Sequence, residues 1–395
     1  MSGLAHEKRN VAILVTSQML FMIASITVMT LSGVVGAHLS PDPALATLPI
    51  AMMMLGTVVS TLPASLFMKK VGRRLGFLVG VTLGGLGGGL LSFTAIALDS
   101  FWLFAAGNLL LGVYQGFAMY YRFAAADVAS PAFKSRAISL VMAAGVVAAF
   151  LGPWNASLLV DWIARVPLGG PYLMIALLAL VALGLLSQLQ VPPSGEPQPG
   201  DELRPMKQIA AQPAFIAAVM AAAVGYAVMI LVMTATPLAM RSAGFEMSQV
   251  AFIMQWHVLG MFAPSFVTGS LIARFGVEKI LLVGALLLAA TTLVATQGQT
   301  LAHFWVALVL LGVGWNFLFI GGSALLTRLH SERERGKVQG VNDFIIFSFV
   351  ALGSLMSGQL MHYLGWELLN LTMLAPVLLV VLVIGWWQFR RPAVA

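Results

Sequence analysis

Four side chains able to bind a soft metal ion are spaced by one helical turn in two neighbouring apolar segments. Met229 and Met233 lie in the first segment, and His257 and Met261 lie in the second. Residues four apart share one face of a helix. If the two segments pack antiparallel, three thioethers and one imidazole converge between them. Thioether sulfur is a soft donor that suits Cu(I), and imidazole also binds copper. The pattern therefore predicts a copper site.

The depth of these side chains agrees with an inward route. Counted from the outer helix ends at 1.5 Å per residue, Met233 lies at about 6 Å and Met261 at about 21 Å, near mid-bilayer. His257 carries the most information, because an ionisable residue deep in a span is costly and is by default a functional candidate. A structural alternative stays open. The chain has 22 methionines, so one M-x-x-x-M pair is expected by chance as core filling, and a neutral His257 can hydrogen-bond to Gln255 or to a neighbouring helix.

The composition is that of a polytopic membrane protein. Of the 395 residues, 60% are hydrophobic and 9% are charged. Roughly twelve apolar segments of about 20 residues follow one another, each long enough to cross a bilayer core of roughly 30 Å. The net charge of +7 reports membrane topology rather than nucleic-acid binding, since the basic residues lie in short loops. With no cysteine, disulfides, zinc–thiolate sites and thiol redox chemistry are excluded.

The basic residues orient the predicted spans. When every second loop is assigned to the cytoplasm, only Arg165 and Arg241 of the 21 Lys and Arg residues fall outside. A shift by one span would reverse this bias, so both termini are predicted to be cytoplasmic. The predicted spans are 11–36, 46–68, 75–97, 101–122, one that contains 152–155, then 171–190, 212–237, 248–272, 279–297, 303–326, 338–361 and 367–389.

The spans form two related halves. Residues 191–211 are rich in proline and polar side chains and are predicted to be a cytoplasmic linker between six-span halves at 1–190 and 212–395. The sequence Leu-Leu-Gly-Val occurs at 110–113 and again at 310–313. A repeat of six spans is typical of a pseudo-symmetric transporter with its site near mid-bilayer, between the halves. The predicted fold class is an all-α membrane protein with twelve transmembrane helices.

The loops after the second and eighth spans resemble the G-x-L-a-D-R-x-G-R-K signature of the major facilitator superfamily. The matching positions in the two copies are Lys70, Gly72, Arg73, Arg74, Gly269, Leu271, Arg274 and Gly276. The departures are Ser65 for the first glycine, and Lys69 and Ala273 for the acid. The resemblance implies the major facilitator fold, alternating access by rocking of one half on the other, and an inner gate at Lys70, Gly72, Arg73, Arg274 and Gly276.

Within that superfamily, the M-x-x-x-M and H-x-x-x-M pairs on consecutive spans resemble the CcoA-like bacterial copper importers. Those proteins bring copper across the inner membrane for assembly of haem–copper oxidases, the cbb3 type in particular. The resemblance implies that Met229, Met233, His257 and Met261 bind the copper. It also implies a bacterial inner-membrane location and a copper-donating chaperone as partner. Relatives without the pairs carry organic solutes such as riboflavin.

Other polar and aromatic side chains in the spans either line an aqueous cavity or join helices by hydrogen bonds, and both roles stay open. These residues are Asn108, Tyr114, Gln115, Asn155, Trp256 and Asn316. Two roles are also open for Asp343, about one and a half turns into its span. It either couples protons or pairs with Arg335 or Lys337 at the inner gate, and the pairing is favoured.

The sequence therefore predicts a monomeric importer in the lipid bilayer that carries copper as Cu(I), holds no permanent cofactor and binds no nucleic acid. The alternative is a carrier of an organic solute, by riboflavin-like uptake or drug efflux. In that case the methionines are packing, and the cavity is lined by Tyr114, Tyr120, Trp154, Trp256 and Trp315. A non-transporting receptor or assembly scaffold is a third hypothesis. Since no nucleophile, metal-hydrolase or phosphate-loop motif is present, an enzyme is not expected.

Overall fold

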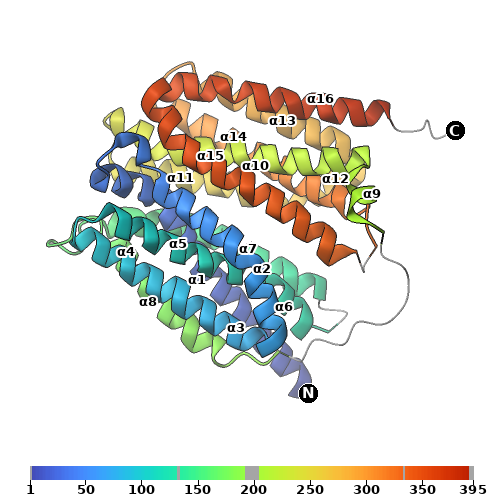
Figure 1. The fold of residues 1–395 in the computed structure, drawn as a ribbon, viewed down its shortest axis with the longest axis horizontal. Coiled ribbons are helices and arrows are strands. Elements are labelled where there is room, and N and C mark those ends of the chain that lie inside the picture. The colour runs from blue at the N-terminus through green and yellow to red at the C-terminus, as the bar shows by residue number, and fades with distance from the viewer. Residues whose placement is uncertain (1, 131–133, 192–203, 332–333, 391–395) are drawn as a thin grey trace. The chain divides into compact units, whose positions relative to one another are not determined.

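The computed structural model describes residues 2–130, 134–191, 204–331 and 334–390, and within them the chain is helical with no strand (Figure 1). In these ranges nine segments are long and apolar enough to cross a bilayer, and two shorter apolar helices, Ala143–Leu158 and Gly170–Leu186, accompany them. One of the nine, Lys337–Phe389, holds two predicted spans and is divided at Gly365, where φ is +72°. The predicted all-α fold of twelve spans is confirmed.

The helices follow the predicted spans closely. They are α1 (Ser2–Leu39), α2 (Leu48–Val71), α3 (Arg73–Gly80), α4 (Gly87–Ala97), α5 (Phe101–Ala118), α6 (Tyr121–Val128), α7 (Lys134–Leu158), α8 (Gly170–Leu186), α9 (Met206–Ala210), α10 (Pro213–Ser242), α11 (Met247–Phe262), α12 (Ser265–Phe275), α13 (Val277–Ala295), α14 (Leu301–Leu326), α15 (Arg335–Thr372) and α16 (Leu374–Phe389). A short 3-10 helix, η1 (Pro43–Leu45), precedes α2, and a π-helical segment, η2 (Val81–Leu86), joins α3 to α4.

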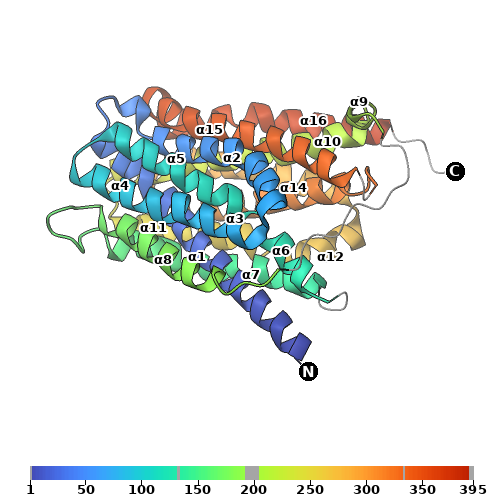
Figure 2. The ribbon, with the colours of Figure 1, turned by 60° about the horizontal axis from the view of Figure 1, so that its bottom comes forward.

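The chain divides into two compact units. Unit 1 consists of Met1–Pro197 and Glu246–Gln255, and unit 2 of Gln198–Phe245 and Trp256–Ala395, so the division runs through α11. In unit 1, α1 packs on α7 and α2 packs on α5. In unit 2, α10 packs on α14 and α15 (Figure 2). The predicted domain bounds stay a prediction, and residues 192–203 of the predicted linker lie outside the described ranges.

Glycines bring helices of each unit into backbone contact. In unit 1, a Cβ at Gly112 of α5 would collide with the carbonyl oxygen of Met53 on α2. In unit 2, a Cβ at Gly312 of α14 would lie 2.6 Å from the carbonyl oxygen of His257 on α11. The two glycines occupy the same position of the Leu-Leu-Gly-Val repeat, so the repeat is structural, and His257 in one copy corresponds to Met53 in the other. Small residues permit such contacts between helices in lipid.

Two residues of the predicted inner gate are turn glycines. Gly72 follows α2 with φ +88°, and its N–H donates to the carbonyl oxygen of Met68 at 2.9 Å. Gly276 follows α12 with φ +90°, and its N–H donates to Ile272 at 3.0 Å. Residues with a Cβ are disfavoured at such positive φ values. The signature glycines therefore allow the chain to leave one helix and enter the next.

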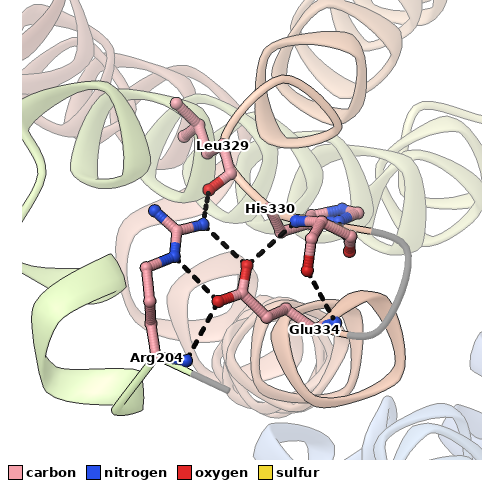
Figure 3. Close-up of polar contacts among 5 residues, drawn as sticks. Arg204, Leu329, His330 and Glu334 are labelled. Carbon is pink, nitrogen blue, oxygen red and sulfur yellow. Dashed lines mark hydrogen bonds and ion pairs between the residues drawn. The ribbon is translucent and has the colours of Figure 1, made fainter. Parts of the chain in front are cut away.

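An ion pair closes one end of unit 2, before α9 and before α15. The guanidinium of Arg204 donates to both carboxylate oxygens of Glu334, at 2.7 and 2.6 Å, and to the carbonyl oxygen of Leu329 at 2.9 Å (Figure 3). The Ser331 N–H donates to Glu334 at 2.9 Å. Bidentate pairing of this kind fixes geometry as well as charge. It ties residue 204, which leads into α9, to the start of α15.

We predict a pH-dependent contribution of this pair. The Arg204 guanidinium, and then the Ser331 N–H, hold the pKa of Glu334 well below its ordinary 4.5. A carboxyl whose pKa falls on folding stabilises the fold above its unfolded pKa, and this contribution is lost as pH falls through the folded value. Glu334→Gln should lower the melting temperature of the detergent-solubilised protein at pH 7, and the gap between the two melting temperatures should narrow steadily as the pH falls below 4.5. The exposed Glu367→Gln is the control. A gap that is constant with pH would contradict this account.

Candidate functional site

The predicted copper residues are all enclosed in unit 2. Met229 and Met233 of α10 are 1% and 4% exposed, and His257 and Met261 of α11 are 0% and 7% exposed. His257 Nδ1 lies 2.8 Å from the carbonyl oxygen of Leu308 on α14, so Nδ1–H is the donor. In the described ranges, Nε2 has no hydrogen-bond partner, and no hydrogen bond joins the α10 pair to the α11 pair. Their predicted convergence stays a prediction. The hydrogen bond to Leu308 on α14 is the kind of bond to a neighbouring helix that the structural alternative for His257 expects.

Asn316 braces the break between α11 and α12. Pro264 lacks an N–H, which interrupts the helix. The Asn316 side chain donates to the carbonyl oxygen of Met261 at 2.6 Å and to Ser265 Oγ at 2.7 Å, and its oxygen accepts from Thr268 Oγ1 at 2.7 Å. The amide is fully buried. Of the two predicted roles for this residue, the structure shows the interhelical one.

Asn108 belongs to a buried polar cluster that joins three helices of unit 1. Ser32 of α1 donates to Asn108 Oδ1 at 3.0 Å and lies 2.6 Å from the hydroxyl of Tyr172 on α8. Asn155 Nδ2 donates to Thr27 Oγ1 at 2.9 Å. Both amides thus join α1 to its neighbours. Ser32 and Tyr172 were missed in the sequence, because a lone serine or tyrosine within an apolar span carries no spacing signal.

A small cavity in unit 1 involves another predicted residue, Tyr114. Phe21, Met53, Leu111 and Tyr114 are among the residues that line its free volume of about 10 Å³. This is the lower limit for one water molecule. The cavity is too small for an organic solute, and Gln115 is not part of its lining.

At the predicted inner gate, Arg73 forms an ion pair that sequence reasoning missed. Its guanidinium lies 2.6 Å from the carboxylate of Asp127 and also donates to the carbonyl oxygen of Tyr120 at 3.4 Å. Asp127 is not part of the superfamily signature, so its pairing with Arg73 becomes visible only in the folded structure. Arg274 lies over the Phe275 ring at 5.2 Å.

Two further gate candidates were Lys70 and Asp343. Lys70 is exposed. The Asn342 side chain donates to Asp343 Oδ1 at 3.0 Å. The side chain of Arg335, one predicted partner of Asp343, lies outside the described residues.

Five aromatic rings from four helices of unit 2 form a continuous cluster, which we call the unit 2 aromatic cluster. Its members are Tyr226 (α10), Phe262 (α11), Trp315 and Phe319 (α14) and Phe347 (α15). Trp315 and Phe319 stack at 5.0 Å and 9°, and Tyr226 meets both edge-on at 5.2 and 5.6 Å. The sequence singled out only Trp315. The four-residue spacing of Trp315 and Phe319 is a signal that identifies the second ring.

Two indole N–H groups on α14 have no hydrogen-bond acceptor among the described residues. The Nε1 atoms of Trp305 and Trp315 are buried without a hydrogen-bond acceptor among the described residues. Leaving a buried donor unpaired costs about 1–3 kcal/mol. Trp305 meets Trp256, a predicted cavity residue that is 38% exposed, at 5.6 Å. Trp315 belongs to the unit 2 aromatic cluster.

A multi-pass helical fold with a six-span repeat defines a membrane carrier. The model of the Major Facilitator Superfamily matches residues 14–263 and 219–395, and the chain belongs to that superfamily. It is a transporter, not an enzyme. A POT family transporter in complex with 5-aminolevulinic acid has a TM-score of 0.75 at 12% identity, covering 96% of this chain and 97% of its own. A bacterial homologue of the human lysosomal transporter Spinster, in an inward-facing and occupied conformation, has a TM-score of 0.71 at 16% identity, covering 96% and 95%. These two structures support the fold alone.

A curated relative corrects the predicted function. The riboflavin transporter RfnT of Brucella anthropi is 43% identical over 97% of this chain and 96% of its own length. The prediction of copper import is therefore wrong, and the resemblance to CcoA-like importers is unconfirmed. The physical reason lies in the residue types. Methionine fills apolar cores, and His257 satisfies its Nδ1–H on a backbone carbonyl, so both pairs have uses in helix packing.

We predict that Asn316 contributes more to stability than a buried amide that bonds only within its own helix. Asn316→Ala should destabilise unit 2 by about 1–3 kcal/mol, because the carbonyl group of Met261 at the break loses a donor. Asn370→Ala is the matched control, since that buried side chain donates, among the described residues, only to Trp366 of its own helix. Thermal unfolding in detergent compares them. Equal losses for the two variants would show that Asn316 is not a brace.

Proposed function

We propose that this chain is a riboflavin transporter. The observation that carries the proposal is the 43% identity with RfnT of Brucella anthropi over 97% of the chain. At this identity and coverage the two chains share their helices and connecting loops, not one domain alone. The organic-solute hypothesis drawn from the sequence is thus the one that the comparison favours.

The chemistry of unit 2 supports an uncharged, flat aromatic solute. Riboflavin consists of a three-ring isoalloxazine and a ribityl chain, and neither carries a charge at neutral pH. Such a solute needs aromatic surface and a few hydrogen bonds rather than a charged pocket. Unit 2 supplies the aromatic cluster, whereas its ion pair of Arg204 and Glu334 lies outside the spans.

The proposal also includes location and topology. The chain is a monomer in the bacterial inner membrane, and both its termini are cytoplasmic. The observation that supports this orientation is that the Lys and Arg residues gather in alternate loops. It works by alternating access of its two halves and needs no permanently bound cofactor. Methionines 229, 233 and 261 are packing residues in this proposal.

Expression in a bacterial riboflavin auxotroph tests the proposal. The chain should restore growth on low riboflavin and give saturable uptake of labelled riboflavin that excess unlabelled riboflavin, but not copper salt, suppresses. Met229→Ile and Met261→Ile should retain uptake within about twofold of wild type, because they keep apolar bulk and remove only sulfur. No riboflavin uptake by a protein verified to be folded and in the membrane would overturn the proposal.

A further inference from the structure

We propose that the unit 2 aromatic cluster binds the isoalloxazine ring of riboflavin, and that the indole N–H of Trp315 donates to a carbonyl oxygen or ring nitrogen at the edge of that ring. The inference rests on the proposed function and assigns the ring-binding residues within unit 2. The ribityl chain is left to other groups.

The position of the cluster suits a transported solute. Tyr226 lies about 20 Å along α10 from its first residue, and Trp315 about 21 Å along α14. The hydrocarbon core is roughly 30 Å thick, so both rings lie well inside the membrane. Phe262 is the last residue of α11, directly before the break at Ala263–Pro264. Because the rings from these four helices contact one another, they lie at one depth.

The arrangement of the rings provides both a support and a contact surface. Trp315 and Phe347 are buried, at 5% and 8% exposure, whereas Tyr226, Phe262 and Phe319 are partly exposed. The two buried rings therefore support the three partly exposed rings that they contact and hold them at their observed tilts. Aromatic rings interact best when stacked with an offset or when edge meets face. A flat three-ring solute can make both kinds of contact with the partly exposed rings, as nucleic-acid bases do on aromatic side chains.

The Trp315 indole supplies the polar part of the site. Its Nε1 is enclosed and has no acceptor in the described part of the chain, and a buried polar group without a partner calls for one. The isoalloxazine edge carries two carbonyl oxygens and ring nitrogens that accept hydrogen bonds. Tyr172 of unit 1 differs in this respect: its ring also pairs with Phe104, but its hydroxyl lies 2.6 Å from Ser32 Oγ and so already has a partner.

Replacement of Trp315 tests the site against a matched control on the same helix. Trp315→Phe keeps an aromatic ring and removes the N–H. Trp305→Phe makes the same change at an indole that also lacks an acceptor but lies outside the cluster. Riboflavin binding to the purified, detergent-solubilised proteins is measured by quenching of flavin fluorescence. Trp315→Phe should raise the Kd about tenfold, as expected for one lost hydrogen bond, and Trp305→Phe should leave it unchanged.

A second set of binding measurements distinguishes recognition of the isoalloxazine ring from recognition of the ribityl chain. Lumiflavin, which has the isoalloxazine ring with a methyl group in place of the ribityl chain, should compete with riboflavin on the wild type and lose affinity in Trp315→Phe by a similar factor. Ribitol should not compete. Phe262→Leu, which removes a partly exposed ring at a helix end, answers the same question if Trp315→Phe folds poorly, and it should weaken lumiflavin binding.

The outcomes distinguish the two proposals. If the folded wild type binds and carries riboflavin but Trp315→Phe and Phe262→Leu match Trp305→Phe in affinity, the aromatic assignment is overturned and the proposed function stands. If lumiflavin fails to compete on the wild type, the ring is not what the site recognises, and the assignment falls. If the wild type neither binds nor carries riboflavin, both proposals fail together.

Discussion

Backbone contact at Gly312 is the constraint on which the packing of α14 against α11 in unit 2 depends. Apolar side chains gain little by leaving lipid for another helix, so close packing and hydrogen bonds hold such helices together. With only a hydrogen at Gly312, α14 reaches the backbone of α11 at His257. The same approach allows the imidazole to bond to Leu308 and, one turn along α14, the Asn316 amide to reach the break after α11. A side chain at Gly312 would separate all of these contacts at once.

The spans and the repeat could be predicted from sequence because they follow from composition and position. Apolar segments of membrane length, basic loops and Leu-Leu-Gly-Val at 110–113 and 310–313 require no knowledge of tertiary contacts. The role of Asn316 could not be decided in this way. A buried amide either faces a cavity or another helix, and the choice depends on the rotation of α14 about its axis, which Gly312 sets. Asp127 was missed for a similar reason, since its partner Arg73 lies on a different helix.

The copper interpretation shows where residue chemistry alone misleads. Histidine and methionine at one-turn spacing describe a metal ligand set and a helix-packing face equally well. The repeat separates the two uses: the position of His257 in the second copy is occupied by Met53 in the first, and both residues lie buried at the glycine contact of their unit. A position that accepts an apolar side chain in one copy is first of all a packing position. The 43% sequence identity with a riboflavin transporter agrees with a packing role for His257.

The helix break and the aromatic cluster are parts of one arrangement. Trp315 and Asn316 are neighbours on α14. Asn316 holds the end of α11, and Phe262 at that end meets Trp315 at 6.2 Å. The amide brace therefore fixes the position of a ring that the cluster needs. Ordering loose side chains on binding costs free energy. A surface whose rings are already held in place therefore binds a rigid flat solute more tightly than a surface whose rings are mobile. In this fold, hydrogen bonds that satisfy a broken helix also preorganise the aromatic surface beside it.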